Sequence, residues 1–204
     1  GDPINPLDDK GLSMILTVGS LCNNAKLENE NGTWRIAGDP TEGALIATAA
    51  KAGLEKAELE KQYPRIGEIP FTSEKKRMTT IHSTLDGEKI AFMKGAPEVV
   101  LERSMHVFEN GKEKKLTDAK KREIHQNNES FATDALRVLG MAYKKLPGDL
   151  KEFHEGTLEN GLVFLGLQGM IDPPREEAID ANKKCEHAGI RAVMITGAHG
   201  LAAM

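Results

Sequence analysis

Cysteine is scarce in this chain, and long apolar runs are missing. The two cysteines, Cys22 and Cys185, lie far apart and form no metal-ligand spacing, so we expect two reduced thiols and neither a disulfide nor a zinc site. The longest apolar stretch, Gly161 to Ile171, is about half of what a helix needs to cross a bilayer. The first residues also lack a basic and apolar signal pattern. These absences predict a soluble chain.

An excess of basic residues is missing too. Lysine and arginine number 27 against 31 aspartates and glutamates, a formal net charge of −4, so there is no electrostatic case for nucleic acid binding. The composition that remains, 39% hydrophobic and 28% charged residues, is ordinary for a globular protein. At 204 residues the chain is long enough for one substantial domain, or for one domain with a fragment of a second.

The segment Phe92-Met93-Lys94-Gly95-Ala96-Pro97-Glu98 carries the most direct functional signal. It is a short apolar strand that ends in Lys-Gly and continues into a helix begun by proline. Gly95 frees the backbone for a tight turn, and Lys94 becomes a positive charge held where the strand ends. This arrangement suits a nucleotide site, although any surface turn can carry a lysine.

Periodicity and turn signals divide the chain into elements. Helices are predicted over 12–25, 40–53, 55–62, 98–104, 118–135 and 175–188. Strands are predicted over 66–71, 78–85, 89–93, 137–144, 162–170 and 190–195, with a polar hairpin over 106–115 and a loop over 146–160 that holds at most one helical turn. Asp39 can cap the second helix, Pro40 fits its first position, and Glu42 stands where a capping-box carboxylate reaches back.

Two patterns of strand and helix predict two domains in an α/β protein. Residues 1–171 favour a mainly antiparallel sheet flanked by helices, with Asp86-Gly87 as a hairpin turn in its meander. Residues 172–204 favour a helix feeding a buried strand, as in a parallel α/β sheet. We therefore expect a domain boundary between Ile171 and Asp172.

Several motifs in a fixed order resemble the cytoplasmic ATP-binding region of P-type cation-transporting ATPases, over nearly the whole chain. They are Leu21-Cys22-Asn23-Asn24-Ala25, Gly38-Asp39-Pro40-Thr41-Glu42-Gly43-Ala44-Leu45, Pro70-Phe71 with Lys76 and Met78, Lys94-Gly95-Ala96-Pro97-Glu98, Ala135-Leu136-Arg137-Val138-Leu139, Asp172-Pro173-Pro174-Arg175 and Thr196-Gly197. The first two motifs look most like the calcium-pump branch (P2-type). The resemblance implies a nucleotide-binding domain over 1–171 and, over 172–204, a fragment of the haloacid-dehalogenase-like Rossmann domain that is phosphorylated.

The resemblance also implies a set of ATP-binding residues. Phe71 would stack on adenine, Glu42 would lie near the base amino group, Arg137 would lie near the phosphates, and Lys76 and Lys94 would line the pocket. Gly95 and Leu139 complete the set. Each has a structural alternative: a core position for Phe71, solvent for Lys76 in the run Lys75-Lys76-Arg77, a capping box for Glu42, and an outward strand position for Arg137. Ser73 stands where animal calcium pumps often have an arginine, which leaves that phosphate contact in doubt.

The phosphoryl-transfer machinery is expected to be incomplete. Asp172-Pro173-Pro174-Arg175 resembles the hinge between the two domains, and Thr196-Gly197 resembles the start of a Thr-Gly-Asp segment, but the third residue is Ala198. The chain holds no Asp-Lys-Thr-Gly-Thr nucleophile segment and stops before the family's magnesium-binding Gly-Asp-Gly segment. We therefore expect this chain to bind ATP weakly without turnover, with Mg²⁺ acting in the parent enzyme.

The function that follows is delivery of ATP within a membrane pump. The implied partners are ATP and the remaining phosphorylation, actuator and transmembrane domains of the parent, an integral membrane ATPase whose transported cation is taken to be Ca²⁺. One alternative is a pump for Na⁺, K⁺ or H⁺. Another is a non-catalytic nucleotide-sensing or interaction module, which Ala198 would suit. A soluble phosphatase of the same superfamily is disfavoured by the large domain that carries Lys94-Gly95-Ala96-Pro97.

Overall fold

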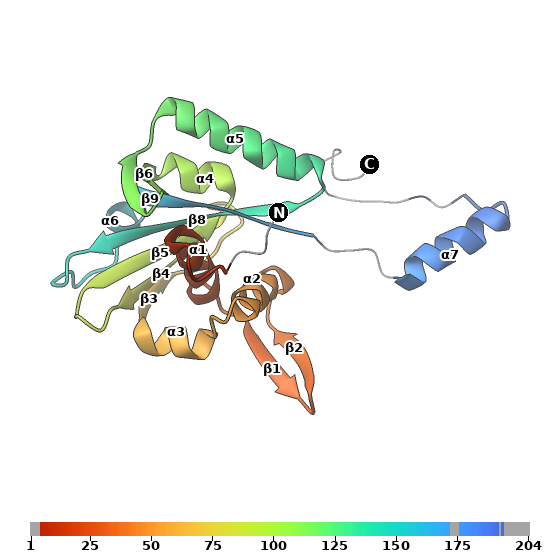
Figure 1. Cartoon of the computed structure of the whole chain (residues 1–204), viewed down its shortest axis with the longest axis horizontal. Coiled ribbons are helices and arrows are strands. Elements are labelled where there is room, and N and C mark those ends of the chain that lie inside the picture. Colours follow the sequence, from red (N-terminus) through yellow and green to blue (C-terminus); the bar gives the residue numbers. More distant parts are fainter. Residues whose placement is uncertain (1–4, 172–175, 192, 194–204) are drawn as a thin grey trace.

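A computed structural model describes residues 5–171, 176–191 and 193, and it has a mixed α/β architecture (Figure 1). Its helices are α1 Lys10–Leu21, α2 Pro40–Lys51, α3 Lys56–Gln62, α4 Pro97–Glu102, α5 Asp118–Thr133, α6 Glu155–Leu158 and α7 Glu176–His187. Its strands are β1 Lys26–Glu30, β2 Thr33–Ala37, β3 Arg65–Ile69, β4 Arg77–Ser83, β5 Lys89–Gly95, β6 Ser104–Glu109, β7 Lys112–Lys115, β8 Arg137–Leu146 and β9 Leu162–Met170. The predicted α/β class is confirmed.

Seven strands form the main sheet in the order β3-β4-β5-β8-β9-β6-β7. Every neighbouring pair is antiparallel except β6 with β9, which is parallel. The mainly antiparallel sheet is thus as predicted, whereas the parallel pair was not. Strands β1 and β2 form a separate hairpin.

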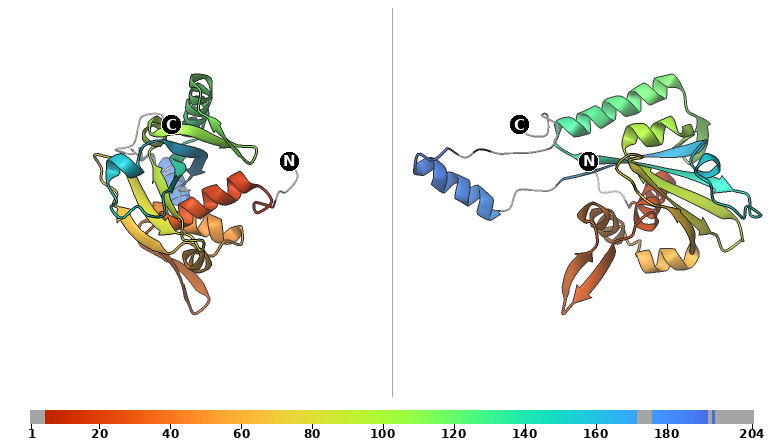
Figure 2. Two further views of the ribbon diagram at one scale, coloured as in Figure 1. Left: turned by 90° about the vertical axis from the view of Figure 1, so that its left-hand side faces the viewer. Right: turned by 180° about the vertical axis from the view of Figure 1, so that it is seen from behind.

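Helices cover both faces of the main sheet. Helices α1, α2 and α3 lie on one side and α4 and α5 on the other, as the view from behind in Figure 2 shows. Successive side chains of β5 point to opposite faces of the sheet. Phe92 belongs to the core beneath α1–α3, and Met93 packs with Val100 and Ile124 beneath α4 and α5. The α1–α3 face is the one that carries the candidate site.

Local signals place the elements around that face. Asp39 accepts hydrogen bonds from the N–H groups of Thr41 and Glu42, and Pro40 is the first residue of α2, so the predicted helix start is confirmed. The predicted turn at Asp86-Gly87 joins β4 to β5, with Gly87 at φ 79°. One helical turn, α6, interrupts the predicted loop over 146–160.

Two local predictions need correction. Helix α1 ends at Leu21 rather than Ala25, because Lys56 of α3 and Arg65 of β3 bind the backbone carbonyls of Leu21, Asn23 and Ala25. The hairpin β1–β2 was not predicted. Its turn, Asn31-Gly32, has positive φ at both residues. An Asn-Gly pair between two strands is a strong sequence signal for a hairpin, and this signal was missed.

The C-terminal segment is described only in part. Helix α7 agrees with the predicted helix over 175–188, and the described side chains of 177–187 are exposed except for Cys185. Of the predicted strand over 190–195, Ile190, Arg191 and Val193 are described, and they are not in a strand. Residues 172–175 and 194–197, with the predicted hinge and Thr196-Gly197, lie outside the described residues. The boundary at Ile171/Asp172 therefore stays a prediction.

None of the described helices is both long enough and apolar enough to cross a bilayer.

Candidate functional site

Lys94 is a nearly buried cation at the end of β5. Its side chain is 8% exposed and points to the sheet face covered by α1 and α2, on the same side as its cross-strand neighbour Met78. The ammonium lies 2.5 Å from Oε1 of Glu42 on α2. Because a buried charge is costly unless it is paired, the carboxylate of Glu42 offsets the cost of burying Lys94.

Glu42 is held by two further donors. Its Oε2 accepts hydrogen bonds from the backbone N–H groups of Asn24, at 2.9 Å, and Ala25, at 3.1 Å. The capping-box interpretation of Glu42 is therefore wrong, because its carboxylate faces the segment after α1 and Asp39 caps α2 by itself. A carboxylate has about four acceptor sites, and three are used here. Among the described residues Lys94 is the one donor to Oε1, so a second acceptor site on that oxygen remains beside Lys94.

Two cationic side chains fix the segment that supplies those donors. Arg65 donates to the carbonyls of Leu21 and Asn23 at 2.9 and 2.8 Å. Lys56 donates to the carbonyls of Asn23 and Ala25 at 3.0 and 2.8 Å, and burial lowers the pKa of its ammonium. Sequence reasoning missed both residues. No local pattern marks them, since their partners lie more than 30 positions away in sequence.

Gly95 and Lys76 meet at the neighbouring strand ends. Arg77 pairs with Gly95 across β4 and β5, and the N–H of Ala96 donates to the carbonyl of Lys76 at 2.9 Å. A Cβ on Gly95 would lie 2.5 Å from that carbonyl oxygen, so glycine is needed for this close approach. The earlier explanation by a tight turn is wrong, because Gly95 belongs to β5 itself and is not among the described glycines with positive φ. Lys76 is exposed and holds φ 50°.

Phe71 lies in the loop between β3 and β4, whose last residue is Lys76. Its side chain is 58% exposed, so the alternative of a core position is wrong. An exposed aromatic ring next to a cationic strand end is suited to stacking on a flat ligand.

Arg137 and Leu139 lie at the start of strand β8. Arg137 is exposed, and its guanidinium donates to Oγ1 of Thr41 at 2.8 Å, which places it at the start of α2. Partial burial raises the pKa of Asp39, but hydrogen bonds from Glu42 and Thr41 and the charge of Arg137 outweigh it and lower that pKa. Leu139 is partly buried against the core on the same face. Its side chain thus offers an apolar surface and no polar contact.

The structure therefore gathers most of the predicted residues around the N-terminus of α2 and the end of β5. Direct contacts join Glu42 to Lys94, Lys76 to the Gly95–Ala96 peptide, and Arg137 to α2. The set carries three cations, Lys76, Lys94 and Arg137, against the single carboxylate of Glu42, which suits an anionic ligand.

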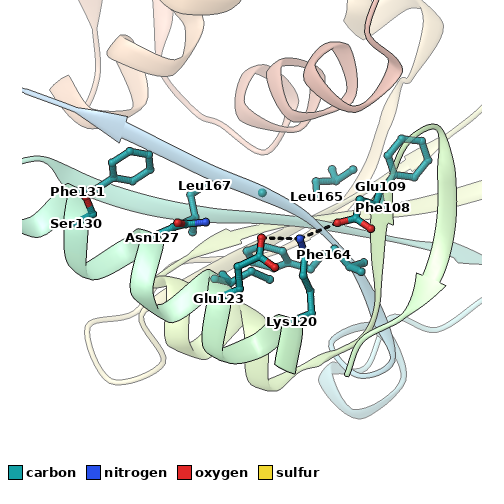
Figure 3. A pocket seen from close by; sticks show the side chains of 13 residues that line it. Phe108, Glu109, Lys120, Glu123, Asn127, Ser130, Phe131, Phe164, Leu165 and Leu167 are labelled. Carbon is teal, nitrogen blue, oxygen red and sulfur yellow. Dashed lines mark hydrogen bonds and ion pairs between the residues drawn. The ribbon is translucent and has the colours of Figure 1, made fainter. Parts of the chain in front are cut away.

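Two of the cavities in the described part of the chain lie well away from these residues. One, of about 370 Å³, is between α5 and strands β6 and β9, where Lys120 joins Glu109 and Glu123 near Phe164 (Figure 3). The other, of about 720 Å³, lies between the β1–β2 hairpin and helices α2 and α3, beside the exposed ring of Trp34. Neither is lined by a residue of the predicted ATP-binding set.

Within the described part of the chain, His, Cys, Asp and Glu side chains form no group of three that could hold a metal ion. Both cysteines are free, and Cys22 is buried, which raises the pKa of its thiol.

Comparisons with known proteins agree on one family. Residues 11–177 match the model of the P-type ATPase cytoplasmic domain N. A cation-transporting ATPase, pma1, of Synechocystis is 44% identical over 92% of this chain and 20% of its own length. Calcium-transporting ATPases of Bacillus subtilis and Bacillus cereus are 39% and 43% identical over 94% and 91% of this chain.

The chain spans about a fifth of the length of these relatives, 20% to 22%. The family match nevertheless covers most of the chain, including every described element from α1, except its first residue, to β9. The chain therefore belongs to the P-type ATPase family and corresponds to its cytoplasmic domain N.

Proposed function

We propose that this chain binds ATP at the surface around Lys94 and presents it for transfer of the γ-phosphoryl group. The observation that carries the proposal is the pairing of the nearly buried Lys94 with Glu42, a fixed charge at a strand end with one acceptor left free beside it. An ion pair with a purely structural role would not explain why the exposed ring of Phe71 and two further exposed cations, Lys76 and Arg137, lie at the same end of the sheet.

Each part of the site suits one part of the nucleotide. The exposed ring of Phe71 would stack on adenine, which is worth about 1–3 kcal/mol per base. The remaining acceptor on Glu42 would take a hydrogen bond from the adenine amino group. Lys76 and Arg137, both exposed, would face the phosphates, and Lys94 would lie between base and phosphates. Gly95 lets the two strand backbones approach closely enough to form this edge.

In the whole protein, the bound ATP would phosphorylate an aspartate outside this chain. That step would drive cation transport by the remaining phosphorylation, actuator and transmembrane domains, in an enzyme that hydrolyses ATP and uses Mg²⁺. Two of the relatives named above are calcium-transporting ATPases, which favours Ca²⁺ over Na⁺, K⁺ or H⁺ as the transported ion. The sequence holds no Asp-Lys-Thr-Gly-Thr segment to supply the aspartate nucleophile, so this chain by itself should bind ATP without turnover.

The test is a calorimetric titration of ATP into the chain and two pairs of variants. We expect a Kd of ~0.1–1 mM, or about 4–5.5 kcal/mol. Phe71→Ala should weaken binding at least fivefold, corresponding to the ~1 kcal/mol lower limit for a stacked ring. Lys94→Ala should also weaken binding severalfold, because it removes the cation between base and phosphates. Two matched controls, Leu85→Ala at an 81% exposed side chain and Lys61→Ala at a 71% exposed one, should leave the Kd unchanged. Absence of saturable binding at several millimolar ATP would reject the proposal in favour of an interaction module.

A further inference from the structure

Arg65, the first residue of β3, uses its guanidinium to clamp the segment that follows α1. Nη2 donates to the carbonyls of Leu21, at 2.9 Å, and Asn23, at 2.8 Å, while Nη1 donates to Oδ1 of Asn24 at 2.7 Å. Nη1 also lies 2.8 Å from the carboxylate of Glu68. The planar fork of arginine can satisfy these diverging acceptors at once, which a lysine ammonium on one flexible stem cannot.

The clamped segment leads directly to the candidate site. The backbone N–H groups of Asn24 and Ala25 both donate to Oε2 of Glu42, and the other oxygen of that carboxylate pairs with Lys94. A continuous set of hydrogen bonds therefore runs from Arg65 through this backbone to Glu42 and Lys94. None of the hydrogen bonds or ion pairs of Arg65 among the described residues goes to Glu42 or Lys94 themselves.

We propose that Arg65 is a positioning residue for the nucleotide site, which rests on the function proposed above. It holds the amides of Asn24 and Ala25 against Glu42, and so fixes the carboxylate that places Lys94. Hydrogen bonds to a charged donor are worth more than neutral ones, and a misplacement of about 1 Å in a site costs substantial binding or rate. Without the clamp, Glu42 loses its fixed orientation although every residue of the site remains present.

A purely structural role is the competing explanation, and the local contacts make it testable. Lys56 also holds the carbonyls of Asn23 and Ala25, so the segment keeps one of its two clamps when Arg65 is replaced. The variant Arg65→Lys retains the positive charge and loses the fork. We therefore expect it to fold and to disturb only the orientation of the amides.

The first experiment is a double-mutant cycle on ATP affinity in the chain of 204 residues, with Arg65→Lys, Glu42→Gln and the double variant. If Arg65 acts through Glu42, Arg65→Lys should weaken ATP binding about three- to tenfold in the native background and less than twofold in the Glu42→Gln background. Arg35→Ala, which removes an arginine from an exposed ion pair on the β1–β2 hairpin, should leave the Kd unchanged.

The second readout does not depend on nucleotide. Amide hydrogen exchange at Asn24 and Ala25 should be at least tenfold faster in Arg65→Lys, while the buried β4 amide of Ile81 exchanges as before. Uniformly faster exchange would show a general loss of stability and overturn the positioning role.

The outcomes separate the two proposals. If the native chain binds ATP but Arg65→Lys binds equally well, or weakens binding equally in both backgrounds, the positioning role is rejected and the ATP site stands. If the native chain does not bind ATP, the proposed function fails and the positioning role fails with it.

Discussion

A buried ion pair behind the candidate site gives the sharpest prediction of stability. The carboxylate of Glu159 is fully buried, and the side chain of Arg77 is only 7% exposed. Arg77 donates to Oε2 of Glu159 from Nη2 at 2.6 Å and from Nε at 2.8 Å, and the hydroxyl of Thr79 donates to Oε1 at 2.8 Å. These contacts tie the segment after α6 to β4, next to the pairing of Arg77 with Gly95.

Replacing Glu159 by glutamine should destabilise the fold by about 3 kcal/mol. Breaking a buried ion pair from one side typically costs ~3–5 kcal/mol, because the remaining charge is left buried without its partner. The lower end applies here, since Glu155 still lies 3.8 Å from Arg77 and glutamine can keep the hydrogen bond from Thr79.

Urea unfolding followed by circular dichroism measures this change as a lower midpoint with an unchanged slope. For a chain of this size ~3 kcal/mol also corresponds to a fall in Tm of about 6–12 °C. Glu58→Gln is the matched control, because its 60% exposed carboxylate pairs with Lys61 at the surface and should cost less than ~1 kcal/mol. A cost below ~1 kcal/mol for Glu159→Gln would refute the reasoning from burial.

Three further predictions concern single residues. Gly95→Ala should lower the free energy of unfolding by about 1–3 kcal/mol and weaken ATP binding, because the new Cβ would lie 2.5 Å from the carbonyl oxygen of Lys76; thermal unfolding and the ATP Kd measure the two effects. Asp39→Ala and Asp9→Ala each remove a helix cap and should each cost ~1 kcal/mol in urea, but only Asp39→Ala should weaken ATP binding, since α2 carries Glu42. Burial lowers the pKa of His82 from 6.5 to about 4, so the unfolded chain takes up the proton first as the pH falls. The free energy of unfolding should therefore be at its full value above pH 6.5 and about 2 kcal/mol lower at pH 5, a loss that should disappear in His82→Gln.

The fold was largely predictable where the signal is local. Asp39 and Pro40 fix the start of α2, Asp86-Gly87 fixes one hairpin, and alternation along β5 gives both packed faces. The parallel pair β6–β9 was not predictable in this way, because it joins strands separated by more than 50 residues, with α5 and β8 between them in sequence.

The candidate site was likewise predictable where the signal is local and not where it depends on contacts between distant segments. The strand end that carries Lys94 can be identified from its own neighbours in sequence. The exposure of Phe71 was not predictable in this way, because the strand predicted over 66–71 ends at Ile69 and leaves Phe71 in the loop that follows. The burial of Lys94 was not predictable either, because it depends on Glu42 of α2 and on the backbone after α1. Arg65 was missed for the same reason, since its partners belong to a distant segment of the chain.

The most direct test of the central claim is to map ATP binding on the isotope-labelled chain by NMR. We predict saturable amide shifts at Thr41, Phe71, Lys76, Lys94 and Gly95. Shifts confined to the cavity beneath α5, or no saturable shift at several millimolar ATP, would contradict the account.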